Sequence, residues 1–522
     1  MTPTDLPPVR TMSPRLHFAP RNNWMNDPNG LVFHHGLYHL YFQYNPQGGE
    51  HAHLSWGHAT STDLARWTEH EPAILWDDTE QIYSGSVVVD HGNTSGFGTV
   101  EEPPLVALYT AAADEHQAQA LAYSTDGGYV WTKYRGNPVL DRGTSDFRDP
   151  KVFRYDDGGD GYWVMVAVEA EDRQVLFHRS DDLKTWTYLS SYGPAGPVGG
   201  VWECPDMFRL AVDGDEADAR WVLLISLNPG GIAGGSGTHY VVGDFDGTTF
   251  RPTAPLPAPA PELLVDRSQS RDELEAFGWI DFGPDCYAGV TFDGLAAHQR
   301  TLIAWMDNWQ YAGSIPHDDS SEYRSAMTLP RRLSLARDRS GAVRLRQAPA
   351  IEVGPDEITE LGSLTGRVAV AAGLVGAGST DAALADAALA DAALADAVRI
   401  RVTATFGDAD SVELRIGAAD AGEVVIRQSH ASGRIDVVRP DVVPPAGVGG
   451  SMSMPVARAG EIAWEIWIDA LNDRVASLEL FAEDGDRVLT ALIPASSHRT
   501  CSLAAVGGAL REVRVAVAEE AY

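Results

Sequence analysis

Ser61-Thr62-Asp63-Leu64-Ala65-Arg66-Trp67-Thr68 is the stretch that decides the fold, because the chain repeats it. Copies with the Asp and the Trp in register begin at Ser124 and Ser180, and a fainter copy begins at Gly243. The first three copies start 63 and then 56 positions apart. A period of roughly 60 residues predicts β-propeller blades, because a four-stranded sheet needs neighbours on both sides to bury its faces. About 320 residues at this period make five blades.

Chance recurrence of surface turns would give a similar pattern, but three copies in register favour a true repeat. Residues 37–44 and 161–168 have the apolar and aromatic content that is typical of strands, and no long helical period interrupts the first part of the chain. Trp67, Trp131 and Trp186, which occupy equivalent positions of the repeat, are interpreted as blade-packing residues.

The composition changes near residue 335, and we expect an all-β protein in three parts. These are a five-bladed β-propeller over residues 1–335, a linker over 336–360 and a C-terminal β-sandwich over 361–522. A tandem Asp-Ala-Ala-Leu-Ala repeat begins at Asp381, where it fits an Ala-rich helix or a flexible surface insertion, and we assign it no function. Alternation of apolar and polar residues returns from Val398 onward and predicts the antiparallel strands of the sandwich.

Charge and cysteine content exclude several classes of protein. The 522 residues carry a formal net charge of -34 at pH 7, which argues against nucleic acid and anionic membranes as partners. The three widely spaced cysteines suit neither a metal-binding pair nor a disulfide framework. No run of about 18 apolar residues and no apolar signal segment is visible. We therefore expect a cytoplasmic protein, or a secreted one whose signal has been removed.

Three acidic residues, each beside Pro or Cys after an expected strand, are the candidates for chemistry. They are Asp27 in Trp24-Met25-Asn26-Asp27-Pro28-Asn29-Gly30, Asp149 in Phe147-Arg148-Asp149-Pro150 and Glu203 in Trp202-Glu203-Cys204-Pro205-Asp206. Hydrolysis of a glycosidic bond generally needs two carboxyl groups, which lie about 5–5.5 Å apart in retaining enzymes. Taken singly, each motif also fits a surface turn, an ion pair or an exposed strand end. One motif in each of three successive blades would favour a shared site.

Around these motifs the sequence resembles glycoside hydrolase family thirty-two, which includes invertases, exo-inulinases and levanases. The resemblance covers nearly the whole chain, in ordered motifs at residues 15–20, 24–30, 41–46, 55–59, 83–86, 148–150, 203–206, 285–288, 308–312, 324–331 and 477–485. It implies a propeller followed by a sandwich. It also implies an enzyme that releases terminal β-fructofuranosyl units from sucrose, fructo-oligosaccharides, inulin or levan through a fructosyl-enzyme.

The resemblance further implies a role for each motif residue. Asp27 would be the nucleophile and Glu203 the general acid/base, while Asp149 would hold the 3- and 4-hydroxyls of fructose with Arg148 beside it. Because the nucleophile must be ionised while the acid is still protonated, the two environments must separate their pKa values. No metal or organic cofactor is implied. The other residues expected around the fructose ring are Trp24, Asn26, Gln43, His51, Ser84, Tyr287 and Trp309.

One stretch departs from the family. Many members carry Glu-Trp-Gly-Asn before the Ser-Trp-Gly-His-Ala motif, with the Trp stacked on the substrate. Here Glu50-His51-Ala52-His53 places His51 at that position. An imidazole offers less apolar contact, so the shape of the subsite and the preferred chain length stay open. The two histidines also suit zinc, but no fourth ligand is evident near them, and we expect no metal.

Three other functions remain to be separated. A fructosyltransferase would pass the fructosyl group to a sugar and leave less free fructose than free glucose. A non-catalytic fructan-binding protein should have lost an acid, yet all three are present. Related five-bladed enzymes that act on arabinans or xylosides would lack the Trp24–Gly30 motif and this sandwich. The sequence leaves open β-2,1 against β-2,6 linkages, sucrose against polymer, and the oligomeric state, including a dimer through the sandwich.

Overall fold

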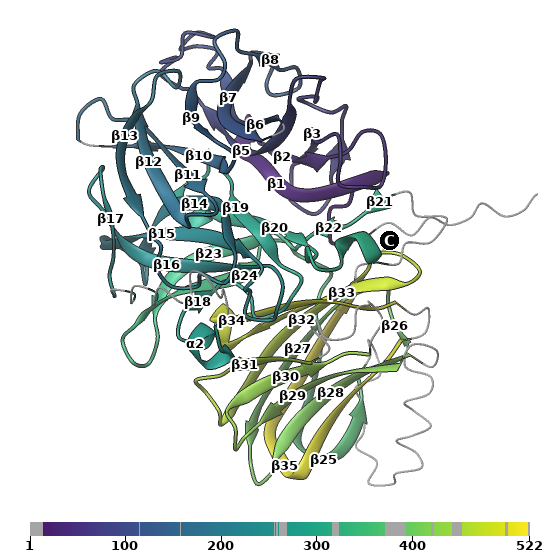
Figure 1. Cartoon of the computed structure of the whole chain (residues 1–522). Helices are drawn as coiled ribbons and strands as arrows, with labels where there is room; N and C mark the ends of the chain where they lie inside the picture. Colours follow the sequence, from purple (N-terminus) through teal and green to yellow (C-terminus); the bar gives the residue numbers. More distant parts are fainter. Residues whose placement is uncertain are drawn as a thin grey trace, which may run out of the picture.

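The computed structural model describes residues 14–113, 115–156, 158–254, 256, 259, 269–315, 323–370, 393–418, 422–440, 451–495 and 499–519. Regular structure in these residues is almost entirely β-strand, with one short α-helix, α2 (Arg271–Glu275), between the two domains (Figure 1). The predicted all-β class is therefore confirmed. In this part of the chain, no helix is long and apolar enough to cross a lipid bilayer.

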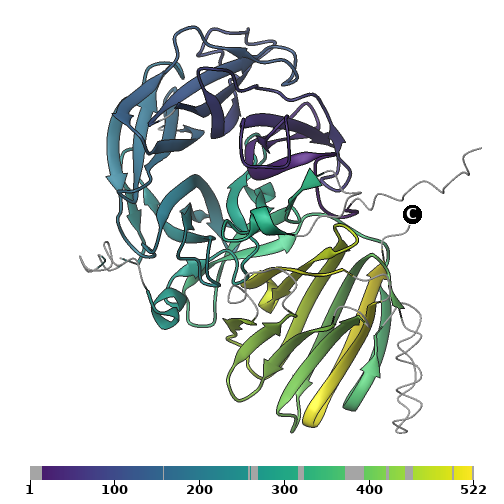
Figure 2. The ribbon, with the colours of Figure 1, turned by 45° about the vertical axis from the view of Figure 1, so that its right-hand side comes forward.

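The blades of the β-propeller surround one axis, as Figure 2 shows. Four sheets make the five blades, because one ten-stranded sheet supplies the fourth and the fifth. The first blade contains β1 (Asn23–His34), β2 (Leu37–Tyr44), β3 (Ser55–Ser61) and β4 (Thr68–Glu69), and the second contains β5 (Gln81–Val89), β6 (Leu105–Ala113), β7 (His116–Ser124) and β8 (Thr132–Lys133). The third contains β10 (Phe147–Tyr155), β11 (Tyr162–Glu169), β12 (Gln174–Ser180) and β13 (Thr187–Tyr192). The fourth contains β14 (Val201–Val212), β15 (Asp215–Asn228), β16 (Gly237–Phe245) and β17 (Phe250–Pro252), and the fifth contains β19 (Tyr287–Thr291), β20 (Thr301–Met306), β23 (Arg331–Arg337) and β24 (Val343–Pro349).

Short strands extend or link the blades. β9 (Leu140–Thr144) pairs with β7, β18 (Gly278–Trp279) with β16, and β22 (Ala326–Met327) with β20. β21 (Tyr323–Arg324) runs parallel to the start of β1, so chain from the last blade hydrogen-bonds to the first. The fourth and fifth blades also pair directly, through β14 and β23.

The repeat that predicts the blades forms the turn between the third and fourth strands of a blade. Asp63, Asp126 and Asp182 each accept two backbone N–H groups from residues two to four positions later, at 2.7–3.1 Å. The indole nitrogens of the repeat tryptophans donate to backbone carbonyls three residues earlier, at 2.9–3.1 Å. The Asp therefore closes the turn and the Trp fastens the turn to the outer strand, which explains their fixed spacing.

Apolar side chains fill the space between neighbouring blades. Trp56 and Tyr109 are fully buried between the first and second blades, and Leu108 and Met165 between the second and third. Each sheet thus covers a face of the next, which an isolated four-stranded sheet could not do.

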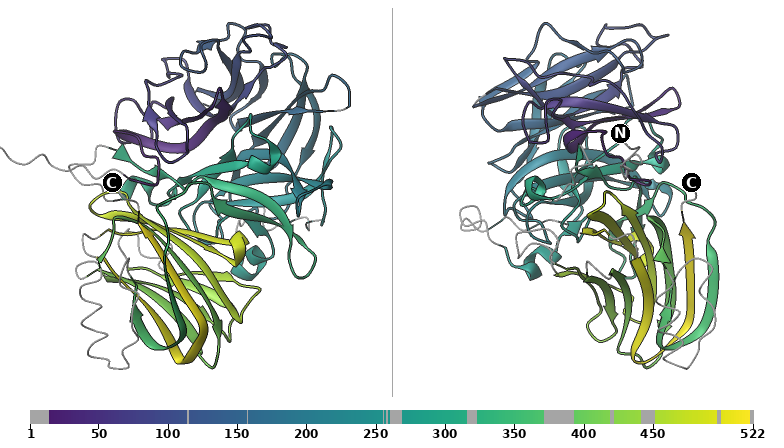
Figure 3. Two further views of the ribbon diagram at one scale, coloured as in Figure 1. Left: turned by 180° about the vertical axis from the view of Figure 1, so that it is seen from behind. Right: turned by 90° about the vertical axis from the view of Figure 1, so that its right-hand side faces the viewer.

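The C-terminal sandwich, which Figure 3 shows from two further sides, is built around one long strand, β35 (Arg499–Glu519). Its first half pairs with β28 and its second half with β27, so β35 passes from one layer to the other. Gly507, at the crossover, has a φ of +79°, and a Cβ there would lie 2.0 Å from a carboxylate oxygen of Asp410. The other strands are β25 (Glu357–Ala369), β26 (Ala393–Leu394), β27 (Ala397–Phe406), β28 (Ser411–Ala418), β29 (Gly422–Ser429), β30 (Arg434–Val438), β31 (Ser451–Pro455), β32 (Glu461–Ala470), β33 (Val475–Ala482) and β34 (Arg487–Pro494).

The boundary between the domains lies later than the sequence suggested. Residue 335, the expected end of the propeller, falls inside β23, and β24 still pairs with β23 along its whole length. We propose that the propeller ends at Pro349 and that the sandwich begins with β25 at Glu357. Most of the Asp-Ala-Ala-Leu-Ala repeat lies outside the described residues.

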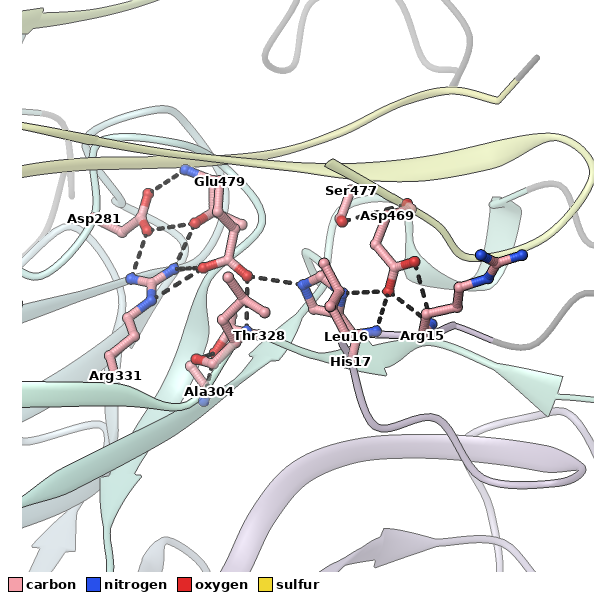
Figure 4. A network of polar contacts seen from close by, with 12 residues as sticks. Arg15, Leu16, His17, Asp281, Ala304, Thr328, Arg331, Asp469, Ser477 and Glu479 are labelled. Atoms are coloured by element: carbon pink, nitrogen blue, oxygen red, sulfur yellow. Dashed lines mark hydrogen bonds and ion pairs between the residues drawn. The ribbon is translucent and has the colours of Figure 1, made fainter. Parts of the chain in front are cut away.

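A buried network of charges joins the two domains (Figure 4). His17, from the segment before the first blade, contacts Asp469 of β32 at 2.9 Å and Glu479 of β33 at 3.0 Å. Glu479 also binds Arg331 of β23 at 2.7 Å, and Arg331 binds Asp281 at 2.9 Å. All five side chains are at most 1% exposed. Charges buried this deeply are tolerated only when paired, so the network holds propeller and sandwich in one arrangement.

This network predicts a loss of stability in alkaline solution. Burial alone lowers the pKa of His17, but its hydrogen bonds to Asp469 and Glu479 outweigh burial and raise the pKa to about 9. The charged form therefore stabilises the fold fully below about pH 6.5, and this stabilisation declines until it is lost above about pH 9. We expect His17→Gln to remove a contribution of about 3 kcal/mol at pH 6 and little at pH 10.

The measurement is the free energy of unfolding of both proteins between pH 6 and 10. His116→Gln is the matched control, because His116 also pairs with an aspartate but is 48% exposed. Parallel curves for the wild type and His17→Gln would contradict the assignment.

Candidate active site

The innermost strand of every blade carries a β-bulge near its start. β1, β5, β10, β14 and β19 contact one another in sequence, and β19 contacts β1, so the five strands form a closed ring. The regular pairing of each strand with its neighbour shifts there, and a bulge re-aims the side chains beside it. The residues that the pairing skips are Asn26-Asp27, Tyr83-Ser84, Asp149-Pro150, Cys204-Pro205 and Ala288-Gly289.

Pro or Gly follows Asp27, Ser84, Asp149, Cys204 and Ala288. Pro150 and Pro205 lie inside their bulges, where a residue without an N–H leaves no donor unpaired, whereas Pro28 and Gly85 already pair again with the next strand. Asp149, Cys204 and Ala288 have φ values of +62°, +44° and +53°. Such angles are strained for residues other than Gly, and strain of this kind is typical of functional sites.

Asp27 and Asp149 converge on one residue, Cys204. The Oδ2 atom of Asp27 lies 3.5 Å from the Sγ of Cys204 and accepts a hydrogen bond from the Ser84 hydroxyl at 2.7 Å. The Oδ2 atom of Asp149 accepts the backbone N–H of Cys204 at 2.9 Å and lies 3.6 Å from the same Sγ. The two carboxyl groups, 122 positions apart in the chain, therefore share one site.

Glu203 stands beside this pair and is the more open group. Its Oε1 accepts a hydrogen bond from Arg148 Nη2 at 3.1 Å, and its Oε2 accepts one from the Tyr287 hydroxyl. Its side chain is 21% exposed, against 7% for Asp149. The three acids come from the first, third and fourth blades, with Ser84 supplied by the second, so the expectation of three successive blades was wrong.

Burial and mutual repulsion shift the titration of the site. Burial, followed by the charge of Glu203, raises the pKa of Asp27 to about 6 against the pull of the Ser84, Asn26 and Cys204 hydrogen bonds. Burial also raises the pKa of Asp149 to about 7, although Arg148 opposes it. Asp27 is therefore easily ionised only above about pH 6. Its Oδ1 is buried and has no hydrogen-bond partner among the described residues.

Aromatic side chains line one side of the site that holds the three carboxyl groups. Trp24 stacks on Trp309 with ring centroids 6.1 Å apart, and His51 meets both rings edge to face, at 5.7 and 4.9 Å. Trp24 also donates its indole N–H to Asn26 Oδ1 at 2.8 Å, which orients the residue next to Asp27. Gln43 is buried and donates to the backbone of Ile82 at 3.0 Å, two residues before Ser84.

Two residues of the site were not predicted. Cys204 bridges both aspartates, and Thr110 accepts the backbone N–H of Asp149 at 2.8 Å. Cys204 stands before Pro205 as Asp27 stands before Pro28, so its equivalence was visible in the sequence. Thr110 lies within β6 and offered no such signal.

The two histidines of Glu50-His51-Ala52-His53, considered above as zinc ligands, pack on different aromatic residues. His51 packs on Trp24 and Trp309, whereas His53 packs on Trp76 at 4.4 Å. Among the residues that the structure describes, no group of three or more His, Cys, Asp or Glu side chains is arranged to hold a metal ion.

Comparison with known proteins gives consistent matches. Residues 17–349 match the family model described as Glycosyl hydrolases family 32 N-terminal domain. The levanase of Bacillus subtilis (strain 168) is 46% identical over 345 residues, 65% of this chain and 47% of the levanase. The extracellular exo-inulinase of Aspergillus niger is 43% identical over 349 residues, 62% of either chain. This chain therefore spans less than two thirds of the length of these two relatives.

A solved structure covers the whole chain. The crystal structure of exo-inulinase from Aspergillus awamori matches with a TM-score of 0.84 and 32% identity, over 99% of both chains. The match includes the sandwich as well as the propeller.

Proposed function

The chain belongs to family 32 of the glycosyl hydrolases, and from this premise we propose that it is a retaining β-fructosidase. It would release terminal β-fructofuranosyl units from sucrose and fructans. The observation that carries the proposal is the convergence of Asp27, Asp149 and Glu203 around Cys204 and Arg148. A retaining glycosidase needs a nucleophile and an acid/base on the two sides of one sugar carbon.

We assign the nucleophile to Asp27. Its Oδ2 is held by Ser84 and Cys204, which leaves Oδ1 free of hydrogen bonds to described residues and able to attack the anomeric carbon. Attack forms a bond from this oxygen to the carbon while the bond to the leaving oxygen breaks. Water then attacks the same carbon and frees the carboxylate.

We assign the acid/base to Glu203. It would protonate the leaving oxygen in the first step and take a proton from the attacking water in the second. Its greater exposure suits exchange of a proton with water. Once deprotonated, it is stabilised by Arg148 and by the hydroxyl of Tyr287.

Asp149 is proposed to hold the fructose ring. It is buried beside Arg148, at 3.9 Å, and its carboxylate is adjacent to the cysteine that touches Asp27. Carboxylates close to the ring stabilise the positive charge that develops in an oxocarbenium-like transition state. Trp24, Asn26, Gln43, His51, Ser84, Arg148, Tyr287 and Trp309 are proposed to line the same subsite.

The direct test is a sugar-release profile on sucrose, inulin and levan, measured side by side. A hydrolase releases free fructose and glucose from sucrose in equal amounts, and it releases fructose singly from the polymers. A large deficit of free fructose during sucrose turnover would favour a fructosyltransferase, and no release from any of the three would refute the proposed function.

The cytoplasmic location expected from the sequence competes with secretion, which the extracellular exo-inulinase relative favours.

The titration of Asp27 predicts the pH dependence of the reaction. Asp27 must be ionised to attack, and its pKa is raised to about 6, so kcat/KM should fall as the pH drops below about 6. Because the charge of Glu203 contributes to that rise, Glu203→Gln should lower the pKa of Asp27 and move this acid limb to lower pH. The profile of the variant is measured with a fructoside whose leaving group departs without protonation. An acid limb at the same pH in both enzymes would contradict the coupling.

A further inference from the structure

A second hollow opens directly beside the proposed active site. This cleft has a volume of about 530 Å³ and runs from His51 and Tyr83 to Trp76, Asp78 and Ala113. His51 belongs also to the aromatic wall with Trp24 and Trp309, and Tyr83 precedes Ser84. The cleft and the proposed fructose subsite therefore share His51, and Tyr83 packs against the same cluster as Trp24.

The cleft leads away from the side of Glu203. Tyr83 and Trp309 pack against the cluster that contains Cys204, the residue after Glu203, and Tyr287, whose hydroxyl donates to the Glu203 carboxylate. A general acid must lie within hydrogen-bond reach of the leaving oxygen. The part of a substrate beyond that oxygen therefore points toward His51, Tyr83 and the cleft.

The far end of the cleft has the chemistry of a sugar site. Trp76 is half-buried and its ring rests on His53, with centroids 4.4 Å apart. Beside it stand exposed Asp78 and Asp77, and Lys133 binds Asp77 at 2.8 Å and Glu80 at 2.7 Å. An aromatic ring with neighbouring carboxylates suits a neutral sugar ring, which offers apolar C–H faces and donating hydroxyls.

We propose that the cleft between His51 and Trp76 binds the leaving-group side of a neutral oligosaccharide, with Trp76 as the platform for the third sugar ring. This proposal rests on the proposed function. Sucrose, with two rings, ends near His51 and Tyr83, whereas a longer fructan reaches Trp76. The cleft thus sets a preference for chain length.

The test compares Trp76→Ala with the wild type on sucrose and on nystose, which has four sugar rings. We expect kcat/KM for nystose to fall about tenfold, as the loss of one aromatic contact surface implies, while kcat/KM for sucrose stays within about twofold. Trp76→Phe should restore most of the nystose activity. Tyr188→Ala is the matched control, because it removes a 52% exposed aromatic ring in the third blade, away from the cleft.

Binding of nystose and of sucrose is measured by calorimetry with each protein carrying Asp27→Asn as well, so that neither sugar is hydrolysed during the titration. Weaker nystose binding by Trp76→Ala, with sucrose binding unchanged, supports the cleft. Equal losses on both sugars, or no loss on either, overturn it. If the wild type binds nystose through Trp76 but hydrolyses neither sugar, the cleft stands and the proposed function fails.

Discussion

Asp27→Asn is expected to reduce kcat for sucrose by about 10⁴- to 10⁶-fold, the size of effect seen when a nucleophile is removed. The amide keeps the shape of the side chain and can still accept from Ser84, but it cannot form the fructosyl-enzyme. The loss of kcat is measured from initial rates of the purified proteins at saturating sucrose. Residual activity above about 1% of the wild type would contradict the assignment.

The same variant is expected to be at least as stable as the wild type. Burial and Glu203 raise the pKa of Asp27 to about 6, so its ionised form destabilises the fold above that pH. Replacement by a neutral amide removes this cost, and Tm at pH 7 should stay equal or rise. Asp63→Asn, in a turn of the same blade, is the matched control and should keep full activity. A lower Tm for Asp27→Asn would mean that lost activity reflects lost folding.

Glu203→Ala is expected to slow sucrose hydrolysis by about 10²- to 10⁴-fold, the usual contribution of a general acid. An aryl fructoside, whose leaving group departs without a proton, should lose far less in the step that forms the fructosyl-enzyme. The comparison is made from the burst and steady-state rates on both substrates. Equal losses on both in the first step would show that Glu203 does not act as the acid.

The matched control for this variant is Glu171→Ala, an exposed glutamate in the turn that follows β11. It should leave both substrates unaffected. Arg148 and Tyr287, which bind the Glu203 carboxylate, are not suitable controls because they belong to the proposed site.

The fold was largely predictable because its repeat has a local cause. The Asp and the Trp of each copy make hydrogen bonds within one turn, so the same spacing between them recurs in the sequence between residues 61 and 187. The end of the propeller was missed because the pairing of β23 with β24 is a contact between segments that no repeat marks. The network around His17 joins residues more than 450 positions apart, and no local sequence pattern predicts it.

The residue types that meet in the candidate site were visible in the sequence, but the geometry of their meeting was not. Asp27 and Asp149 each lie in a bulge and directly before a proline, and this signal is local. Their meeting at Cys204 depends on closing five blades into a ring, as does the contact of Arg148 with Glu203 across two blades. The raised pKa of Asp27 was also not foreseen, because it arises from burial and from a charge 176 positions away.

The central claim is that a fructosyl unit becomes covalently attached to Asp27, while Glu203 acts as the general acid/base on the other side of the sugar carbon. Glu203→Ala incubated briefly with an aryl fructoside should accumulate this adduct, since the base that activates water is missing. Mass spectrometry of its peptides should find one fructosyl unit on the peptide that contains Asp27. An adduct on another residue, or turnover with no adduct on any peptide, would contradict the account.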